Sequence, residues 1–200
     1  LNAVGNLTST AYLATPSNNF DFNYNDFAVF AVYKTEATTG SYYPIISKNL
    51  GFGSGSPSIN YWALYGNSTN PPNVLFLYLP TRGVQYQMTS PNTTTSTWIM
   101  ISGQLLRSGT NSVCVLNGTA GTALAVNNSP LNPGYVPILI GATTQGATPL
   151  SLGGLVGEVL IYNGTTTVFQ RQQVEGYLAW KWGLQGSLPA SHPFFNAPPS

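Results

Sequence analysis

The carboxylates are the side chains of this 200-residue chain best suited to acid–base chemistry, and there are five of them: Asp21, Asp26, Glu36, Glu158 and Glu175. Most glycoside hydrolases need two carboxyl groups about 5–9.5 Å apart, on either side of the bond that is cleaved. No two of the five are spaced two residues apart, the spacing that would project both from one face of a strand. We therefore expect no catalysis, and we predict that Glu158 is a structural hydrogen-bond acceptor.

The sequence lacks the usual motifs of nucleophilic catalysis. The sequence contains no G-x-S-x-G, and its single histidine, His192, lies in a proline-flanked tail where a general base would be poorly held. The single cysteine, Cys114, lies in an apolar run, which predicts a buried, inert thiol and excludes an internal disulfide. The glycine-rich stretch 51–58 lacks the lysine and the following helix of a phosphate-binding loop. The residues point to binding rather than to an enzyme.

The charge of the chain argues against two classes of partner. Only 6% of the residues are charged, the formal net charge is +1, and the six basic residues are scattered along the sequence. Phosphate binding needs clustered basic residues, so we expect no nucleic-acid partner. No apolar run approaches the roughly 18 residues of a membrane span, so we expect no membrane insertion. Leu1 is not followed by a basic segment, so we expect no signal peptide within this chain.

Tyrosines and side-chain amides are the remaining candidates for binding, because a sugar ring stacks on an aromatic face while amides bond its hydroxyl groups. If Trp62 and Leu64 of "YWALY" lie inside, alternation places their neighbours on an outer or concave surface. For each candidate, a place in the core or on ordinary surface is the competing interpretation. The candidate ligand-binding residues are Tyr42, Tyr43, Tyr61, Tyr65, Arg82, Gln85 and Gln87.

The elements that must position these residues are mostly strands. "FDFNYN" (20–25) alternates apolar and polar residues, and "FAVFAVYK" (27–34) is a continuous apolar run typical of a strand covered on both faces. About ten such runs, separated by turn motifs and not by helices, predict an antiparallel two-sheet sandwich. Further strands are expected at 43–48, 60–66, 73–80, 83–88, 97–106, 112–118, 135–141 and 154–164.

One helix is expected near the C-terminus, at about 168–182. Thr167 and Gln170 fit a capping box, and Gly183 fits the residue that ends the helix. Polar residues 170–173 are expected to face water. The apolar stripe predicted from helical spacing consists of Val174, Tyr177, Leu178 and the stem of Lys181.

The tail that follows is rich in proline and is expected to be extended along the domain, with Phe194 and Phe195 as anchoring side chains. Trp180 and Trp182 are two residues apart and cannot share one helix face, so at least one of them should pack differently, for example beneath the tail.

The segment "GLVGEVLIYNGTTTVFQRQQVEGYLAWKWGL" (154–184) resembles the closing segment of concanavalin A-like, laminin-G-type jelly-roll domains of bacterial surface and large-virus proteins. Upstream, "DFAVFAVYK", "TWIMISGQLL" and "SVCVLNGT" are similar to strands of the same family, in the same order. The matching positions are Gly154, Glu158, Ile161, Tyr162, Asn163, Tyr177, Leu178, Lys181, Trp182 and Gly183.

This resemblance implies an all-β, two-sheet antiparallel jelly-roll sandwich over residues 1–184, with one C-terminal helix, followed by a tail over 185–200 that packs on the domain or leaves it. It implies that Glu158, Tyr162, Tyr177, Trp182 and Gly183 form a structural motif. No cofactor is required. Domains of this type often hold a calcium ion at their rim, and Asp21 or Asp26 would be its ligands here, although "DFNYND" lacks the glycine and the final acid of an EF-hand loop.

We expect a non-catalytic carbohydrate-binding or adhesion module of a larger surface or virion protein, located outside the cell. Its partner would be a glycan or a cell-surface or capsid protein, and oligomerisation is compatible with the sequence. The alternatives are a structural capsid, fibre or protein–protein interaction domain and, third, an accessory or degenerate glycanase domain. Six N-x-S/T sequons occur, at Asn6, Asn67, Asn92, Asn117, Asn127 and Asn163, an excess over chance too small to prove secretion.

Overall fold

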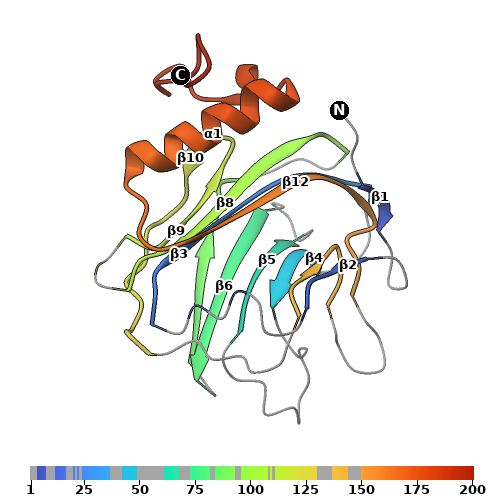
Figure 1. Cartoon of the computed structure of the whole chain (residues 1–200), viewed down its shortest axis with the longest axis vertical. Helices are drawn as coiled ribbons and strands as arrows, with labels where there is room; N and C mark the ends of the chain where they lie inside the picture. Colours follow the sequence, from blue (N-terminus) through green and yellow to red (C-terminus); the bar gives the residue numbers. More distant parts are fainter. Residues whose placement is uncertain are drawn as a thin grey trace.

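Two antiparallel sheets stack face to face, and one helix covers the outer face of the first sheet (Figure 1). The computed structural model describes residues 4–7, 12–16, 20, 22, 24–36, 42–48, 61–67, 73–81, 84–92, 96–107, 109, 111–129, 137–143 and 150–200. Among these residues each sheet has six strands, so the predicted two-sheet sandwich is confirmed.

Strand order in both sheets departs from sequence order, as it must in a jelly roll. The first sheet has the order β1 (Val4–Leu7), β12 (Gly154–Asn163), β3 (Phe27–Thr35), β8 (Ile99–Leu105), β9 (Val113–Leu116) and β10 (Thr119–Ala120). The second has the order β2 (Leu13–Ala14), β11 (Leu139–Ile140), β4 (Tyr42–Lys48), β5 (Tyr61–Asn67), β6 (Asn73–Thr81) and β7 (Val84–Thr89). Thus β12, near the end of the chain, pairs with both β1 and β3.

Aromatic rings fill the space between the sheets. Phe27 stacks on Phe22 with ring centroids 4.2 Å apart, and Trp62 lies 5.3 Å from Phe27. Trp62 and Leu64 face this core, as predicted from "YWALY". Cys114 is buried there too, as predicted, and burial raises the pKa of its thiol well above the ordinary value, which disfavours the reactive thiolate.

The predicted strand at 20–25 is wrong. Phe20 and Tyr24 are exposed and only Phe22 is buried, and the amide of Asn25 donates to the carbonyl of Phe22 in a turn. Phe20 has a φ of 63°, which no strand residue adopts. The alternating residues of this stretch therefore do not form one face of a strand, and only the Phe22 ring packs in the core.

A bulge in β12 sets which of its side chains face the helix. Val156 is opposite Tyr33 and Glu158 is opposite Val32, so two residues of β12 oppose one step of β3. Val156 faces the core between the sheets, whereas Glu158 contacts the helix. Val156 and Glu158 therefore lie on opposite faces of β12 although they are two residues apart, because alternation fails across the bulge.

The helix, α1 (Val168–Trp182), has the predicted bounds and the predicted caps. Thr167 Oγ1 accepts from the Gln170 amide at 3.2 Å, and Gln170 Oε1 accepts from the Thr167 amide at 2.9 Å. Gly183 ends the helix at a φ of 71°, a conformation that glycine adopts without steric cost. Within the described part of the chain, no helix has the length and apolar character needed to cross a bilayer.

The buried face of α1 differs from the predicted stripe. Leu178 packs on Phe30 and Met100 of the first sheet, but Tyr177 and Lys181 are exposed. Arg171, expected to face water, is buried instead. The prediction from helical spacing counted Tyr177 and the Lys181 stem as apolar. It could not detect that a buried ion pair lies on the same helix face as Leu178. The full buried set is Arg171, Glu175, Gly176, Leu178 and Ala179.

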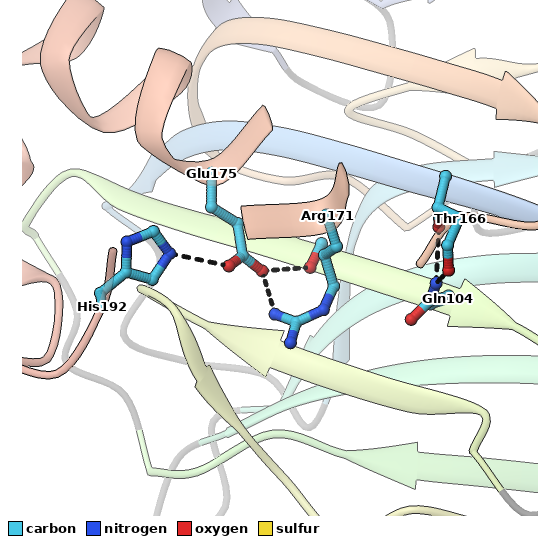
Figure 2. Close-up of polar contacts among 6 residues, drawn as sticks. Gln104, Thr166, Arg171, Glu175 and His192 are labelled. Carbon is cyan, nitrogen blue, oxygen red and sulfur yellow. Dashed lines mark hydrogen bonds and ion pairs between the residues drawn. The ribbon is translucent and has the colours of Figure 1, made fainter. Parts of the chain in front are cut away.

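A buried polar network fixes α1 and the tail to the sheet, as Figure 2 shows. Arg171 Nη1 lies 2.5 Å from Glu175 Oε1, one turn of helix away. Ser102 of β8 donates to the same oxygen at 3.3 Å, and His192 Nε2 lies 3.3 Å from Glu175 Oε2. Arg171, Glu175 and His192 are all buried, so His192 has a structural place in the fold rather than a loose one.

The tail is not extended. It forms a short 3-10 helix, η1 (Gln185–Ser187), and then two turns in which the amides of His192 and Phe195 donate to the carbonyls of the residues three positions back. Trp180 Nε1 donates to the carbonyl of Phe194 at 2.8 Å, whereas Trp182 packs against Trp98. The two tryptophans therefore do pack differently, and one of them contacts the tail as expected.

The bulge leads to a stability prediction. A Cβ atom at Gly157 would lie 2.5 Å from the Trp182 ring, so Gly157→Ala should destabilise the protein by about 1–3 kcal/mol. Gly186 has open space around it, and Gly186→Ala should change stability by less than about 0.5 kcal/mol. Urea unfolding followed by tryptophan fluorescence measures both. Equal stability of the two variants would contradict the close packing of Trp182 on β12.

The buried polar network leads to a second stability prediction. Glu175→Ala leaves the buried Arg171 guanidinium without its carboxylate partner, which should lower the free energy of unfolding by about 3–5 kcal/mol. Glu36→Ala removes an exposed ion pair with Lys34 and should cost less than about 1 kcal/mol. A loss under 1 kcal/mol in Glu175→Ala would show that the network does not hold the helix.

Candidate functional site

Two of the predicted ligand-binding tyrosines lie in the interior. Tyr43 is 3% exposed and packs in the core between the sheets. Tyr65 is 0% exposed and packs with Ala63 and Leu150 on the other face of the second sheet. The prediction that these rings meet a ligand is wrong, because both faces of this sheet are covered at these positions and alternation alone could not indicate that.

The other predicted ligand-binding residues are not brought together. Tyr42 on β4 is 47% exposed, and Gln87 on β7 is exposed too. Strands β5 and β6 lie between them, which separates β4 from β7 by roughly 14 Å at the usual strand spacing. Arg82 and the side chains of Tyr61 and Gln85 lie outside the described residues. Those three stay predictions.

Asp26, one of the two candidate calcium ligands, binds protein donors with both oxygens. Its Oδ1 accepts from the Arg107 amide at 2.9 Å and its Oδ2 from the Thr165 hydroxyl at 2.9 Å. Among the described residues, no group of three His, Cys, Asp or Glu side chains is placed to hold a metal ion. Asp21 lies outside the described residues, so the calcium site stays a prediction.

A groove of about 700 Å³ lies between the end of β12 and the first half of α1, and we call it the β12–α1 groove. It combines two tyrosine rings with amide and hydroxyl side chains. Its lining residues are Leu160, Tyr162, Asn163, Gly164, Thr165, Thr166, Gln170, Gln173, Val174 and Tyr177.

Both tyrosine rings of the groove are exposed to solvent yet held by neighbours. Tyr162 is 40% exposed, and its ring meets Phe30 edge to face with centroids 5.8 Å apart. Tyr177 is 43% exposed, and its hydroxyl accepts from Lys181 Nζ at 2.7 Å and donates to Glu158 Oε1 at 3.3 Å. Rings that are already fixed lose little side-chain entropy when a ligand binds.

The polar side chains of the groove are amides and hydroxyls. Asn163 Oδ1 accepts from Asn25 Nδ2 at 3.0 Å, and the Asn163 amino group makes no hydrogen bond within the described part of the chain. Gln170 is engaged in the helix cap, whereas the half-buried side chain of Gln173 makes no hydrogen bond among the described residues. A side-chain amide can both donate and accept, as recognition of a hydroxyl group requires.

Glu158 joins β12 to the last turn of α1 beside this groove. Trp182 Nε1 donates to its Oε2 at 2.9 Å, and Lys181 Nζ lies 2.9 Å from the same oxygen. Partial burial alone would raise the pKa of this carboxyl, but the hydrogen bonds from Trp182, Lys181 and Tyr177 and the charge of Lys181 together hold the pKa below its ordinary value. Glu158 is thus the structural acceptor that the sequence predicted.

A smaller hollow of about 330 Å³ adjoins the β12–α1 groove, and the two share Gly164 and Thr165. Its other lining residues are Tyr24, Asn25, Asp26, Arg107 and Asn128. The connection between β12 and α1 therefore separates an uncharged groove from a hollow that contains one acid and one base.

The sequence assigned Tyr162 and Tyr177 to the structural motif and did not predict that they line a groove. The capping box offered a signal for the groove, because it starts the helix only a few residues after the preceding strand ends. The bulge at Gly157 offered none, because it becomes visible only in the pairing of β12 with β3.

Comparison with known proteins rests on structure, because no protein-family model and no curated protein matches the sequence. The CBM40 domain of the Ruminococcus gnavus IT-sialidase, bound to alpha2,3 sialyllactose, superposes with a TM-score of 0.65 at 14% identity, over 84% of this chain and 95% of that one. Domains LG4-5 of the mouse laminin alpha1 chain give 0.60 at 12% identity, over 82% and 43%. The chain has the concanavalin A-like jelly-roll fold.

A third structure with this fold is a heptameric SAP-like pentraxin from Limulus polyphemus, with a TM-score of 0.56 at 13% identity, over 86% of this chain and 76% of that one. The predicted resemblance to laminin-G-type jelly rolls is therefore confirmed at the level of the fold. Within this concanavalin A-like jelly roll, the β12–α1 groove joins the exposed aromatic and amide side chains into one candidate site.

Glu158 gives a pH prediction. A carboxylate whose pKa is lowered by folding stabilises the protein above its unfolded-state pKa, and that contribution is lost as the pH falls through the folded-state pKa. The stability advantage of the wild type over Glu158→Gln should therefore shrink between about pH 5 and pH 3. Carboxyl NMR titration should place the Glu158 pKa higher in Trp182→Phe than in the wild type. A pKa that does not move would contradict the role of the indole.

Proposed function

We propose that this domain is a non-catalytic carbohydrate-binding or adhesion module and that the β12–α1 groove is its glycan site. The observation that carries the proposal is the pair of solvent-exposed tyrosine rings, each held by a neighbour, that line one groove with the amides of Asn163 and Gln173.

The chemistry of the groove suits a sugar. The C–H face of a pyranose is apolar and can lie on a tyrosine ring, while its hydroxyl groups need partners that both donate and accept. Threonine hydroxyls and side-chain amides provide such partners along the groove. A shallow, solvent-open site of this kind gives weak single contacts, which repeated copies of a module strengthen through avidity.

Binding without catalysis is supported by the carboxylates. None of the groove residues named above is acidic, and Glu158, the nearest acid on β12, accepts from Trp182 and Lys181. Among proteins with the same fold, the CBM40 domain of the Ruminococcus gnavus IT-sialidase is bound to a sialyllactose, which supports a binding role. We place the module in a larger extracellular, surface or virion protein.

A protein–protein role is the second candidate, and the edge of β12 that faces away from β3 favours it. Among the described residues, β1 pairs with this edge only at Gly154 and Val156, so the strand from Gly157 to Asn163 offers backbone groups to an added strand. Such a partner would occupy the edge of β12 and would also cover the groove.

The groove hypothesis predicts which tyrosines matter. Tyr162→Ala and Gln173→Ala should each weaken glycan binding, Tyr162→Ala by about tenfold or more, equivalent to ~1.4 kcal/mol. Tyr42→Ala removes a similarly exposed ring from the second sheet and should leave binding unchanged. Glycan-array screening followed by calorimetry measures these effects on variants that retain the wild-type melting temperature. Loss of binding in Tyr42→Ala alone would move the site to the second sheet.

A further inference from the structure

We infer that the β12–α1 groove recognises neutral sugars and discriminates against sialylated, uronic or sulfated ones. This inference rests on the proposed function, and it specifies the class of glycan at the same site. It separates this domain from the sialyllactose-bound domain that shares its fold, because the same sandwich here presents a groove without charge.

The groove offers an anion no cationic partner. Its polar lining consists of tyrosine, threonine, asparagine and glutamine side chains, and none of its described lining residues is charged. A carboxylate or sulfate loses hydration when it enters a protein groove, and charge-assisted hydrogen bonds from arginine or lysine normally compensate for that loss. Neutral amides compensate for it only in part, whereas they match the needs of a sugar hydroxyl group.

The basic residues elsewhere on the described chain are committed to the fold. Lys48, Arg107 and Arg171 are buried. Lys34 lies 3.7 Å from Glu36, and Lys181 lies 2.9 Å from Glu158. Every basic residue that the structure describes is therefore either buried or paired with a carboxylate.

Lys181 lies beside the groove, because its Nζ donates at 2.7 Å to the hydroxyl of Tyr177, a lining residue. The ammonium also lies over the Tyr177 ring, 5.1 Å from the centroid. Glu158 balances the charge of this ammonium. The hydrogen bonds from the ammonium to Tyr177 and to Glu158 raise the pKa of Lys181. An anionic sugar would have to compete with Glu158 for this ammonium.

The hollow at the other end of the groove does not change this balance. Arg107 and Asp26 both line it, and the amide of Arg107 donates to Asp26 Oδ1. Arg107 is buried, and its Nη1 donates to the carbonyl of Asn25. An acidic sugar that extended from the groove into this hollow would meet a carboxylate as well as a guanidinium.

Matched pairs of glycans test the inference on the whole chain. Lactose, N-acetyllactosamine, chitotriose, mannotriose and cellotetraose form the neutral panel, and 3′-sialyllactose, 6′-sialyllactose and 6′-sulfated N-acetyllactosamine form the acidic one. At least one neutral glycan should bind, with affinity that changes less than about twofold between low and high salt, because no ion pair is involved. Where that glycan has an acidic counterpart, the counterpart should bind at least about tenfold more weakly.

A charge introduced into the groove should reverse the preference. Gln173 is half-buried on α1 and makes no hydrogen bond among the described residues, so its replacement breaks no hydrogen bond among them. Gln173→Arg should increase the affinity for 3′-sialyllactose relative to lactose by several-fold, and this gain should fall with added salt. Gln173→Glu, the matched control, should not increase it.

The outcomes separate the two proposals. The wild type could bind 3′-sialyllactose more tightly than lactose and lose this binding in Tyr162→Ala. That result would overturn the neutral preference and leave the groove as the glycan site. Binding that survives Tyr162→Ala and Gln173→Ala would place the site elsewhere. No binding to any glycan of either panel would overturn the proposed function, and the inference with it.

Discussion

The carboxylate of Glu158 ties the strand β12 to the last turn of α1, since the Trp182 indole and the Lys181 ammonium both donate to it. This contact fixes the C-terminal end of α1 over the first sheet. The capping box at Thr167 starts the helix at its other end, only four residues after β12 stops at Asn163. The β12–α1 groove lies between the end of β12, this short connection and α1.

The second constraint on the helix lies beneath it. The Arg171–Glu175 pair is buried between α1 and the sheet, and His192 brings the tail onto the same carboxylate. A buried ion pair is weak support for stability by itself, but it tolerates few other arrangements, because each partner left alone would be an uncompensated buried charge. The network therefore selects one rotation of the helix about its axis, the rotation that exposes Tyr177 beside Tyr162.

The sequence predicted the features that depend on local chemistry. The capping box, the glycine that ends the helix and the acceptor role of Glu158 follow from a few neighbouring residues and a resemblance. The features it missed depend on long-range partners. The bulge opposite Val32 redirects the side chains of β12, and burial of Arg171 requires a carboxylate one turn along and a sheet to cover both. Tyr43 and Tyr65 were mistaken for surface residues because alternation distinguishes the two faces of a strand and does not indicate what covers each face.

Asn163 adds a consequence that concerns how the protein is made. Its side chain is exposed and lines the groove, and with Gly164 and Thr165 it forms a sequon. An oligosaccharide attached to its amide in a eukaryotic secretory pathway would start inside the β12–α1 groove and compete with any external ligand for the two tyrosine rings. Material from a bacterial cytoplasm would carry no such chain. The host in which this domain is synthesised would thus decide whether an external glycan or the domain's own covalent sugar meets the two rings.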